Sequence, residues 1–216
     1  MEFGEKGFDG ASTRSIAQRA NAHQPQINYH FASKEALWFA AVDHLFGLLG
    51  QAMAGVRFVD AEVSSTPLAE ADPHQLALGF ADVIGRLVAF AAAHPELNRI
   101  MVHEGTAAGD RLTWITETHV APLYRLLQET WTRLRAAGIA APIDASMVHY
   151  VLVGAASLPY VNAPEARLLT GVEPTDPERV AAYAEGLVAT LLPGLAPGDR
   201  PGRPTSEPTH PRNELR

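Results

Sequence analysis

Apolar residues recur at intervals of three and four positions along most of the chain, and no stretch shows the strict alternation typical of a strand. This spacing predicts an all-α fold in which a small N-terminal helical unit precedes a larger C-terminal helical bundle. Residues 1–8 are interpreted as a short stub before the first helix. The helices are expected at residues 12–20, 24–30, 34–54, 73–93, 95–108, 110–137, 142–163 and 176–192.

Two stretches lack helical periodicity and divide the chain into regions. Residues 57–73 are rich in small and polar residues and are expected to form a loop or linker. Residues 193–216 contain six prolines without a periodic pattern and are expected to be a disordered tail. We therefore divide the chain into an N-terminal domain of residues 1–50, a bundle of residues 51–192 and the tail.

Composition and charge narrow the classes of function. The 216 residues, 47% of them hydrophobic, can bury a large core. The chain has no cysteine, which excludes disulfides, zinc–cysteine sites, iron–sulfur clusters and a cysteine nucleophile. The net charge of -7 gives no general attraction for nucleic acid, so any such binding depends on a local surface. No apolar run approaches the roughly 18 residues of a membrane helix and no signal segment opens the chain, so we expect a cytoplasmic protein without a membrane partner.

Residues 12–31 carry the most informative local pattern, two short helices joined by a tight turn. Ser12 or Thr13 can cap the first helix, and the small Ala17 allows the two helices to cross closely. Asn21 occupies the turn, where a left-handed backbone is usual and where asparagine is the most tolerant residue after glycine. These features predict a helix-turn-helix, whose second helix enters the major groove of DNA.

The N-terminal edge of the second helix presents side chains that can read bases. Gln24 and Gln26 can form paired hydrogen bonds with adenine, and the ring of Pro25 can contact a thymine methyl group. Arg14, at the start of the preceding helix, can reach a guanine or a phosphate. Side chains further along the chain suit phosphate contacts, which set register rather than sequence: Tyr29, His30 and Lys34.

Three segments resemble the TetR/AcrR family of bacterial transcription regulators. EKGF at residues 5–8 is similar to the end of the family's first helix, TRSIA at 13–17 to its second helix, and INYHFASKEAL at 27–37 to its most recognisable signature. The resemblance implies an all-α homodimer whose N-terminal domains bind a palindromic operator in double-stranded DNA. It also implies a C-terminal bundle that holds a small-molecule effector, whose binding lowers the affinity for DNA. The family's DNA-contacting positions fall on Thr13, Arg14, Gln24, Pro25 and Gln26 for bases, and include Tyr29, His30 and Lys34 for phosphates.

The N-terminal segment also departs from the family pattern. Asn21 stands where the family usually has glycine, His23 where it has a serine-like cap, and Asn28 where it often has tyrosine. The family's first helix extends further upstream than Met1, so we expect an incomplete first helix. Residues 1–46 carry a net charge of -1, from four basic and five acidic side chains. An alternative therefore stays open, a small-molecule-binding helical protein whose DNA-binding domain has decayed.

The bundle sets polar and aromatic residues among apolar ones, as in ligand pockets between helices. The candidate ligand contacts are Arg99, Met101, His103, Trp114, Thr118, Trp131, Tyr150 and Asn162. The dimer surface is expected on the last two long helices, one with a patch of small residues and one with an apolar face. These positions are Gly154, Ala155, Ala156, Ser157, Leu187, Val188, Leu191 and Leu192. The alternative is that both helices complete the core of one subunit.

No catalytic motif accompanies these features. The chain lacks a nucleophile elbow, a phosphate-binding loop and paired carboxylates at catalytic spacing, so we expect neither an enzyme nor a cofactor. His103, His119 and His149 lie on different predicted helices; a metal site built from them is a less favoured alternative, and we expect no bound metal. The sequence thus predicts a ligand-responsive repressor, whose effector favours a bundle shape that separates the two recognition helices.

Overall fold

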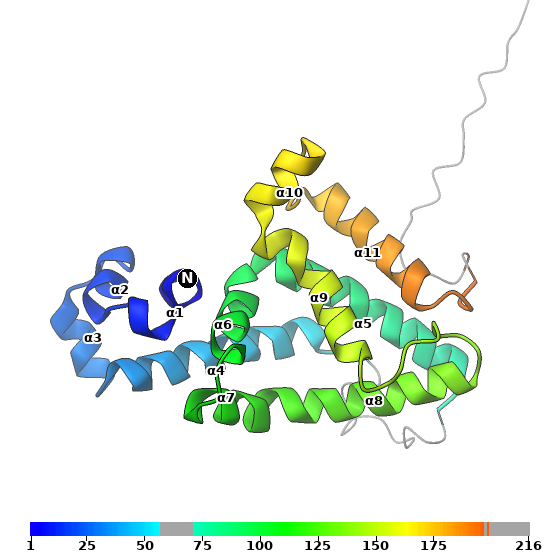
Figure 1. Ribbon diagram of the computed structural model, residues 1–216, viewed down its shortest axis with the longest axis horizontal. Helices are drawn as coiled ribbons and strands as arrows, with labels where there is room; N and C mark the ends of the chain where they lie inside the picture. Colours follow the sequence, from blue (N-terminus) through cyan, green and yellow to red (C-terminus); the bar gives the residue numbers. More distant parts are fainter. Residues whose placement is uncertain (57–70, 197, 199–216) are drawn as a thin grey trace, which may run out of the picture.

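The computed structural model describes residues 1–56, 71–196 and 198, and all regular secondary structure within these residues is helical (Figure 1). We call α1–α3 the head and α5–α11 the body, and α4 runs from the head into the body. The all-α prediction is confirmed. The elements are α1 (Glu2–Gly10), α2 (Thr13–Arg19), α3 (Gln24–His30), α4 (Lys34–Met53), α5 (Pro73–Ala93), α6 (Pro95–Gly105), α7 (Asp110–Ile115), the π-helical turn η2 (Thr116–Val120), α8 (Ala121–Ala136), α9 (Val148–Val161), α10 (Ala163–Thr170) and α11 (Pro177–Leu191).

The core of the body lies between α5, α8, α9 and α11. On α5, Phe80, Ile84 and Val88 repeat at helical spacing and are almost wholly buried. They share one apolar cluster with Trp131 and Leu134 of α8. The apolar period of this segment therefore places one face of α5 at the centre of the bundle.

A second core joins the head to the body. Trp38, Val42 and Leu45 form one stripe along α4 and belong to the same apolar cluster as Phe3 of α1 and Ile115 of α7. Trp38 is wholly buried. Because residues of the head and of the body share this cluster, the head is stabilised by its contact with the body. We call this cluster the junction core.

Helix α1 begins at Glu2, so the predicted stub over residues 1–8 is wrong. Met1 supplies no side-chain cap, and the helix is kinked at Gly7, which has a φ of 67°. Phe3 is buried in the junction core. The helix is therefore held in place by tertiary contacts rather than by local capping, and in the sequence only the family resemblance at residues 5–8 pointed to it.

Ion pairs fasten α1 to α2. The guanidinium of Arg19 donates to both carboxylate oxygens of Glu5 at 2.7 Å, and it lies 3.4 Å from Glu2. Lys6 pairs with Glu2 at 2.6 Å. The hydrogen bond from Lys6 lowers the pKa of Glu2, and the hydrogen bonds from Arg19 lower the pKa of Glu5. Both carboxylates are thus stabilised in their charged form by cations of the head itself.

Several predicted helices differ in extent from the observed ones. The helix expected at 110–137 is divided into α7, η2 and α8, and the helix expected at 142–163 begins only at Val148. Residues after Asn162 form the separate helix α10, which was not among the predicted helices. Pro164 lies in the first turn of α10, where its missing N–H costs nothing, and therefore restarts the helical backbone.

The residues directly after α11 pack on the body. Leu195 is 1% exposed and belongs to the body core, and the N–H of Gly194 donates to the carbonyl of Ile139 at 2.9 Å. The prediction of a disordered tail is therefore wrong for these first residues. Residues 197 and 199–216 of that tail, and residues 57–70 of the predicted linker, lie outside the described residues.

Helices α4 and α5 are each long and apolar enough to cross a bilayer by length and composition. The expectation that no segment reaches this threshold is therefore wrong. The core helix of a globular protein passes the same test, and here apolar side chains of α4 pack in the junction core and those of α5 mainly in the body core.

Two glycine substitutions compare an open position inside α4 with a crowded position after α11. Gly47→Ala lies inside α4, where a methyl group meets nothing within 4 Å, and should raise the free energy of unfolding by about 1 kcal/mol. Gly194→Ala should lower it by about 1–3 kcal/mol, because the added Cβ would lie 2.6 Å from the carbonyl oxygen of Gly138. Urea unfolding of both variants measures the difference. Equal stability of the two would contradict the packing of the segment after α11.

The ion pairs of the head predict a pH dependence. The pKa values of Glu2 and Glu5 are lower in the folded chain than the ordinary value of 4.5, so these groups stabilise the fold above that pH. Their contribution is lost as the pH falls through the lowered pKa values. Arg19→Met should therefore lower stability at neutral pH and flatten its decline between about pH 5 and pH 3. The check is thermal unfolding across that range, with Arg125→Met on α8 as the control that keeps the parent profile.

Candidate nucleic-acid interface and ligand domain

Helices α2 and α3 form the predicted helix-turn-helix. The hydroxyl of Ser12 caps α2 by accepting from the N–H of Ser15 at 3.0 Å, and Ala17 is 2% exposed where the helices cross. Asn21 has a φ of 50°, the left-handed conformation expected for the turn. The N–H of Ala22 donates to the carbonyl of Ala17 at 2.9 Å, which closes the turn. The local signals in the sequence therefore suffice to build this motif.

The N-terminal edge of α3 faces away from the core. Gln24, Pro25 and Gln26 are exposed, and α3 has no buried residue. The carboxamide oxygen of Gln26 accepts from the N–H of His23 at 2.9 Å and thereby caps the helix that His23 itself does not cap. The amide of Gln24 lies 3.4 Å from the hydroxyl of Thr13, so the structure brings these two predicted base contacts together.

The remaining predicted DNA contacts lie in different surroundings. Arg14 and His30 are exposed, and Tyr29 is 86% exposed at the end of α3. Lys34 instead points inward. Its ammonium donates to the carbonyl of Ala11 at 3.0 Å and lies over an aromatic ring of α1. For all of these residues the DNA contact itself stays a prediction.

The candidate ligand contacts do not gather around one cavity. Trp131 is wholly buried and its indole donates to the carbonyl of Ile143 at 2.9 Å, whereas Thr118 and Tyr150 are exposed. The other candidates lie in two places, the contact between α6 and α9 and the region where the head meets the body. Arg99 donates to Val161 beside Asn162, Met101 and Trp114 pack against the junction core, and His103 lines a cavity between head and body.

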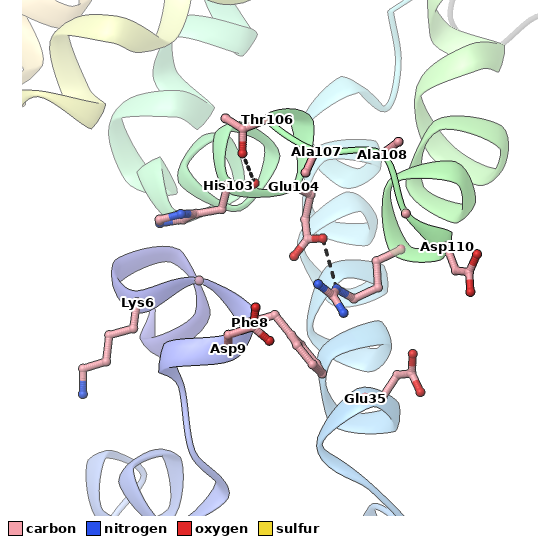
Figure 2. A pocket seen from close by; sticks show the side chains of 13 residues that line it. Lys6, Phe8, Asp9, Glu35, His103, Glu104, Thr106, Ala107, Ala108 and Asp110 are labelled. Atoms are coloured by element: carbon pink, nitrogen blue, oxygen red, sulfur yellow. Dashed lines mark hydrogen bonds and ion pairs between the residues drawn. The ribbon is translucent and has the colours of Figure 1, made fainter.

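That cavity has a volume of about 440 Å³ and lies between α1, the start of α4 and the α6–α7 turn (Figure 2). Its wall carries charged side chains of both signs from head and body. A second hollow, of about 650 Å³, lies between α5 and α11, and half of its lining residues are alanine or glycine. Neither hollow contains more than one of the predicted ligand contacts.

The three histidines considered as metal ligands lie apart. His103 is on α6, His119 pairs with Asp43 of α4 at 3.0 Å, and His149 of α9 lies edge-on to Tyr124. Burial lowers the pKa of His149, which favours its neutral form. Among residues 1–56, 71–196 and 198, no group of three potential metal ligands is close enough to hold an ion.

The leucine-rich face expected to form a dimer surface is part of the body core. Leu187, Val188, Leu191 and Leu192 are at most 9% exposed within one subunit, and Ala156 and Ser157 of the small-residue patch are also buried. These positions satisfy the alternative, in which the helices complete the core of one subunit. The exposed apolar residues of this region lie instead on the outer face of α9 and its N-terminal flank, at helical spacing: Met147, Tyr150, Val151 and Leu158.

Comparison with known proteins assigns both parts of the chain to one family. Residues 1–41 match the family model described as bacterial regulatory proteins, tetR family, and residues 79–191 match the tetracyclin repressor-like C-terminal domain. The HTH-type transcriptional repressor NicS of Pseudomonas putida is 27% identical over 107 residues, which span 50% of this chain and 44% of NicS.

Solved structures share the fold over most of the chain. AibR, in complex with isovaleryl coenzyme A and operator DNA, is 18% identical with a TM-score of 0.64, and the match covers 88% of this chain and 92% of AibR. The ketosteroid transcriptional regulator KstR2 of Mycobacterium tuberculosis is 18% identical with a TM-score of 0.54, over 89% of this chain and 88% of KstR2. The chain, with its N-terminal helix-turn-helix and its C-terminal helical domain, belongs to the tetR family of bacterial regulatory proteins.

Proposed function

We propose that the protein is a cytoplasmic transcriptional repressor that binds a palindromic operator as a homodimer and is released by a small-molecule effector. The observation that carries the proposal is the exposed N-terminal edge of α3, presented outward by a fully formed helix-turn-helix. Backbone caps and a left-handed turn hold this edge in place. Nothing in this arrangement favours the alternative of a decayed DNA-binding domain.

Sequence is read by side chains at the start of α3. Gln24 offers a carboxamide that matches the paired donor and acceptor of adenine, and Pro25 offers an apolar surface for a thymine methyl. The amide–hydroxyl contact with Thr13 orients Gln24 before DNA is present. Tyr29, at the other end of α3, suits a phosphate of the adjacent backbone.

The homodimer uses the outer faces of α9 and α11. Tyr150 is 68% and Leu158 58% exposed, and together with Val151 they form an apolar stripe. Tyr183 of α11 donates its hydroxyl to the carbonyl of Ala155 at 2.7 Å, which links the two helices beside this stripe. An apolar stripe of this kind is costly in water and gains stability when a second copy covers it.

The effector acts through the body. AibR, a structural neighbour, forms a complex with isovaleryl coenzyme A and operator DNA, which supports an organic small molecule as the class of effector. The effector lowers DNA affinity by binding more tightly to the conformation that fits DNA poorly.

A pair of variants on α3 tests the DNA-reading roles. Gln24→Ala should relax sequence preference at one base pair of each half-site, with a loss of about 1–3 kcal/mol in discrimination. Tyr29→Phe should weaken binding to every sequence by about 0.5–1.5 kcal/mol, because it removes only a hydroxyl directed at phosphate. Operator fragments from the chain's own upstream region, with single base changes, supply the measurement at two salt concentrations. If both variants lose affinity equally for all sequences, the assigned roles are wrong.

A charge placed on the α9 stripe tests the dimer. Leu158→Glu should raise the dimer dissociation constant by at least about tenfold, because dimerisation would bury a carboxylate without a partner. Sedimentation velocity measures the change. Val102→Glu, which replaces another exposed apolar residue, on α6, is the matched control and should leave the dimer intact. An unchanged dimer in Leu158→Glu would place the interface on another surface.

A further inference from the structure

Helix α1 links the head to the body independently of α4. Helix α1 packs against α6, and the two helices lie next to each other in Figure 1. Two glycines of α1 face α6 at this contact. A Cβ on Gly4 would lie 3.1 Å from the carbonyl oxygen of Glu96, and one on Gly7 would lie 3.4 Å from the ring of His103. These glycines let the backbone of α1 approach α6 closely, while Phe3 of α1 shares the junction core with Leu97 and Ile100 of α6.

One aromatic side chain of α1 supplies a more specific contact. The guanidinium carbon of Arg111, on α7, lies 3.9 Å from the centroid of the Phe8 ring. The ammonium of Lys34, at the start of α4, lies 4.4 Å from the same centroid. Phe8 therefore contacts one cation from the body and one from the start of α4, and each such contact is attractive through the negative face of the ring.

The position of Arg111 is set by the body. Its Nε donates to a carboxylate oxygen of Glu104 on α6 at 3.0 Å, and Glu104 is 9% exposed. The dashed line from Glu104 in Figure 2 marks this pair. A charge-assisted hydrogen bond to a nearly buried carboxylate is strong and directional, so Arg111 follows the orientation of α6 and α7.

The other cation is tied to the DNA-facing part of the head. Lys34 donates to the carbonyl of Ala11 at 3.0 Å, in the turn between α1 and α2. The next residue, Ser12, is the N-cap of α2. A continuous series of contacts thus runs from Glu104 through Arg111, Phe8 and Lys34 to the first helix of the helix-turn-helix.

We propose that Arg111 is a positioning residue, which sets the orientation of the head on the body through the ring of Phe8. The proposal rests on the proposed function, in which head orientation decides operator affinity. The cavity of about 440 Å³ beside these residues leaves room for the head to shift. A shift of α6 or α7 that moves Arg111 therefore changes the position of the Phe8 ring. The orientation of α2 and α3 relative to the body changes with it.

Distances between spin labels test the positioning role without DNA. The chain has no cysteine, so Gln18→Cys on α2 and Glu129→Cys on α8 give one label on the head and one on the body. Both positions are exposed. Labelled chains diluted with an excess of unlabelled chain report the distance within one subunit by electron–electron resonance.

Arg111→Met should broaden or shift this distance distribution, and Phe8→Leu should do the same while keeping an apolar side chain in place. Arg125→Met is the matched control, because the guanidinium of Arg125 donates to the carbonyl of Ala121 in its own helix, and it should leave the distribution unchanged. A parent-like distribution in both folded variants, verified by circular dichroism, would overturn the proposal. Because Phe8→Leu leaves Glu104 paired with Arg111, it remains informative if Arg111→Met does not fold.

A double-mutant cycle on operator affinity gives a second readout. Arg111→Met and Phe8→Leu should each weaken binding about threefold to fivefold, the size of one cation–π contact. The double variant should be no weaker than the weaker single variant, because both remove the same contact. Strictly additive losses would overturn the proposal. If the parent chain binds no operator, the proposed function fails, and the label distances still decide the role of Arg111.

Discussion

The burial of Trp38 at the point where α4 leaves the head is the constraint on which the rest of the structure depends. Its ring contacts Phe8 of α1, Phe39 of its own helix and Trp114 of α7. The cluster around it includes apolar residues of both head and body. Its indole N–H is buried without a hydrogen-bond partner among the described residues, a cost of about 1–3 kcal/mol that the surrounding apolar contacts offset.

This shared core explains how so small a head can be stable. Three short helices bury too little apolar surface to fold alone, and α3 contributes no buried residue. The head is therefore stabilised by α4 and by the body. The same contacts in the junction core set the orientation of the head. They therefore also set the direction of the exposed N-terminal edge of α3.

The net charge of this protein does not favour DNA binding, so the local arrangement of charged side chains decides its electrostatic contribution. The net charge of -7 repels DNA at long range, and the head carries acidic residues of its own. Glu2 and Glu5 are paired with Lys6 and Arg19, which neutralises part of that acidity on the side of α1. Affinity for an operator then depends on fitted contacts along α2 and α3 rather than on a general positive field.

The sequence by itself determined the elements whose signals are local. Ser12 and Ser33 cap α2 and α4, and Asn21 takes the left-handed turn. Asp72 and Pro73 start α5 at the predicted residue. These features depend on backbone groups within a few positions, so the residues present are enough to predict them. The family signature over residues 27–37 is also local in sequence, and its resemblance to known regulators indicated the fold class and the regulatory function.

Only the tertiary structure decided the features that depend on contacts between residues far apart in the chain. Helix α1 has no cap and forms because Phe3 and Arg19 hold it. The apolar period of α11 could not tell whether its leucines face a second subunit or the body core, because burial by either partner produces the same spacing. Only the structure shows that the ammonium of Lys34 contacts the ring of Phe8 and the carbonyl of Ala11. In each case the deciding contact joins residues far apart in the chain, which periodicity does not record.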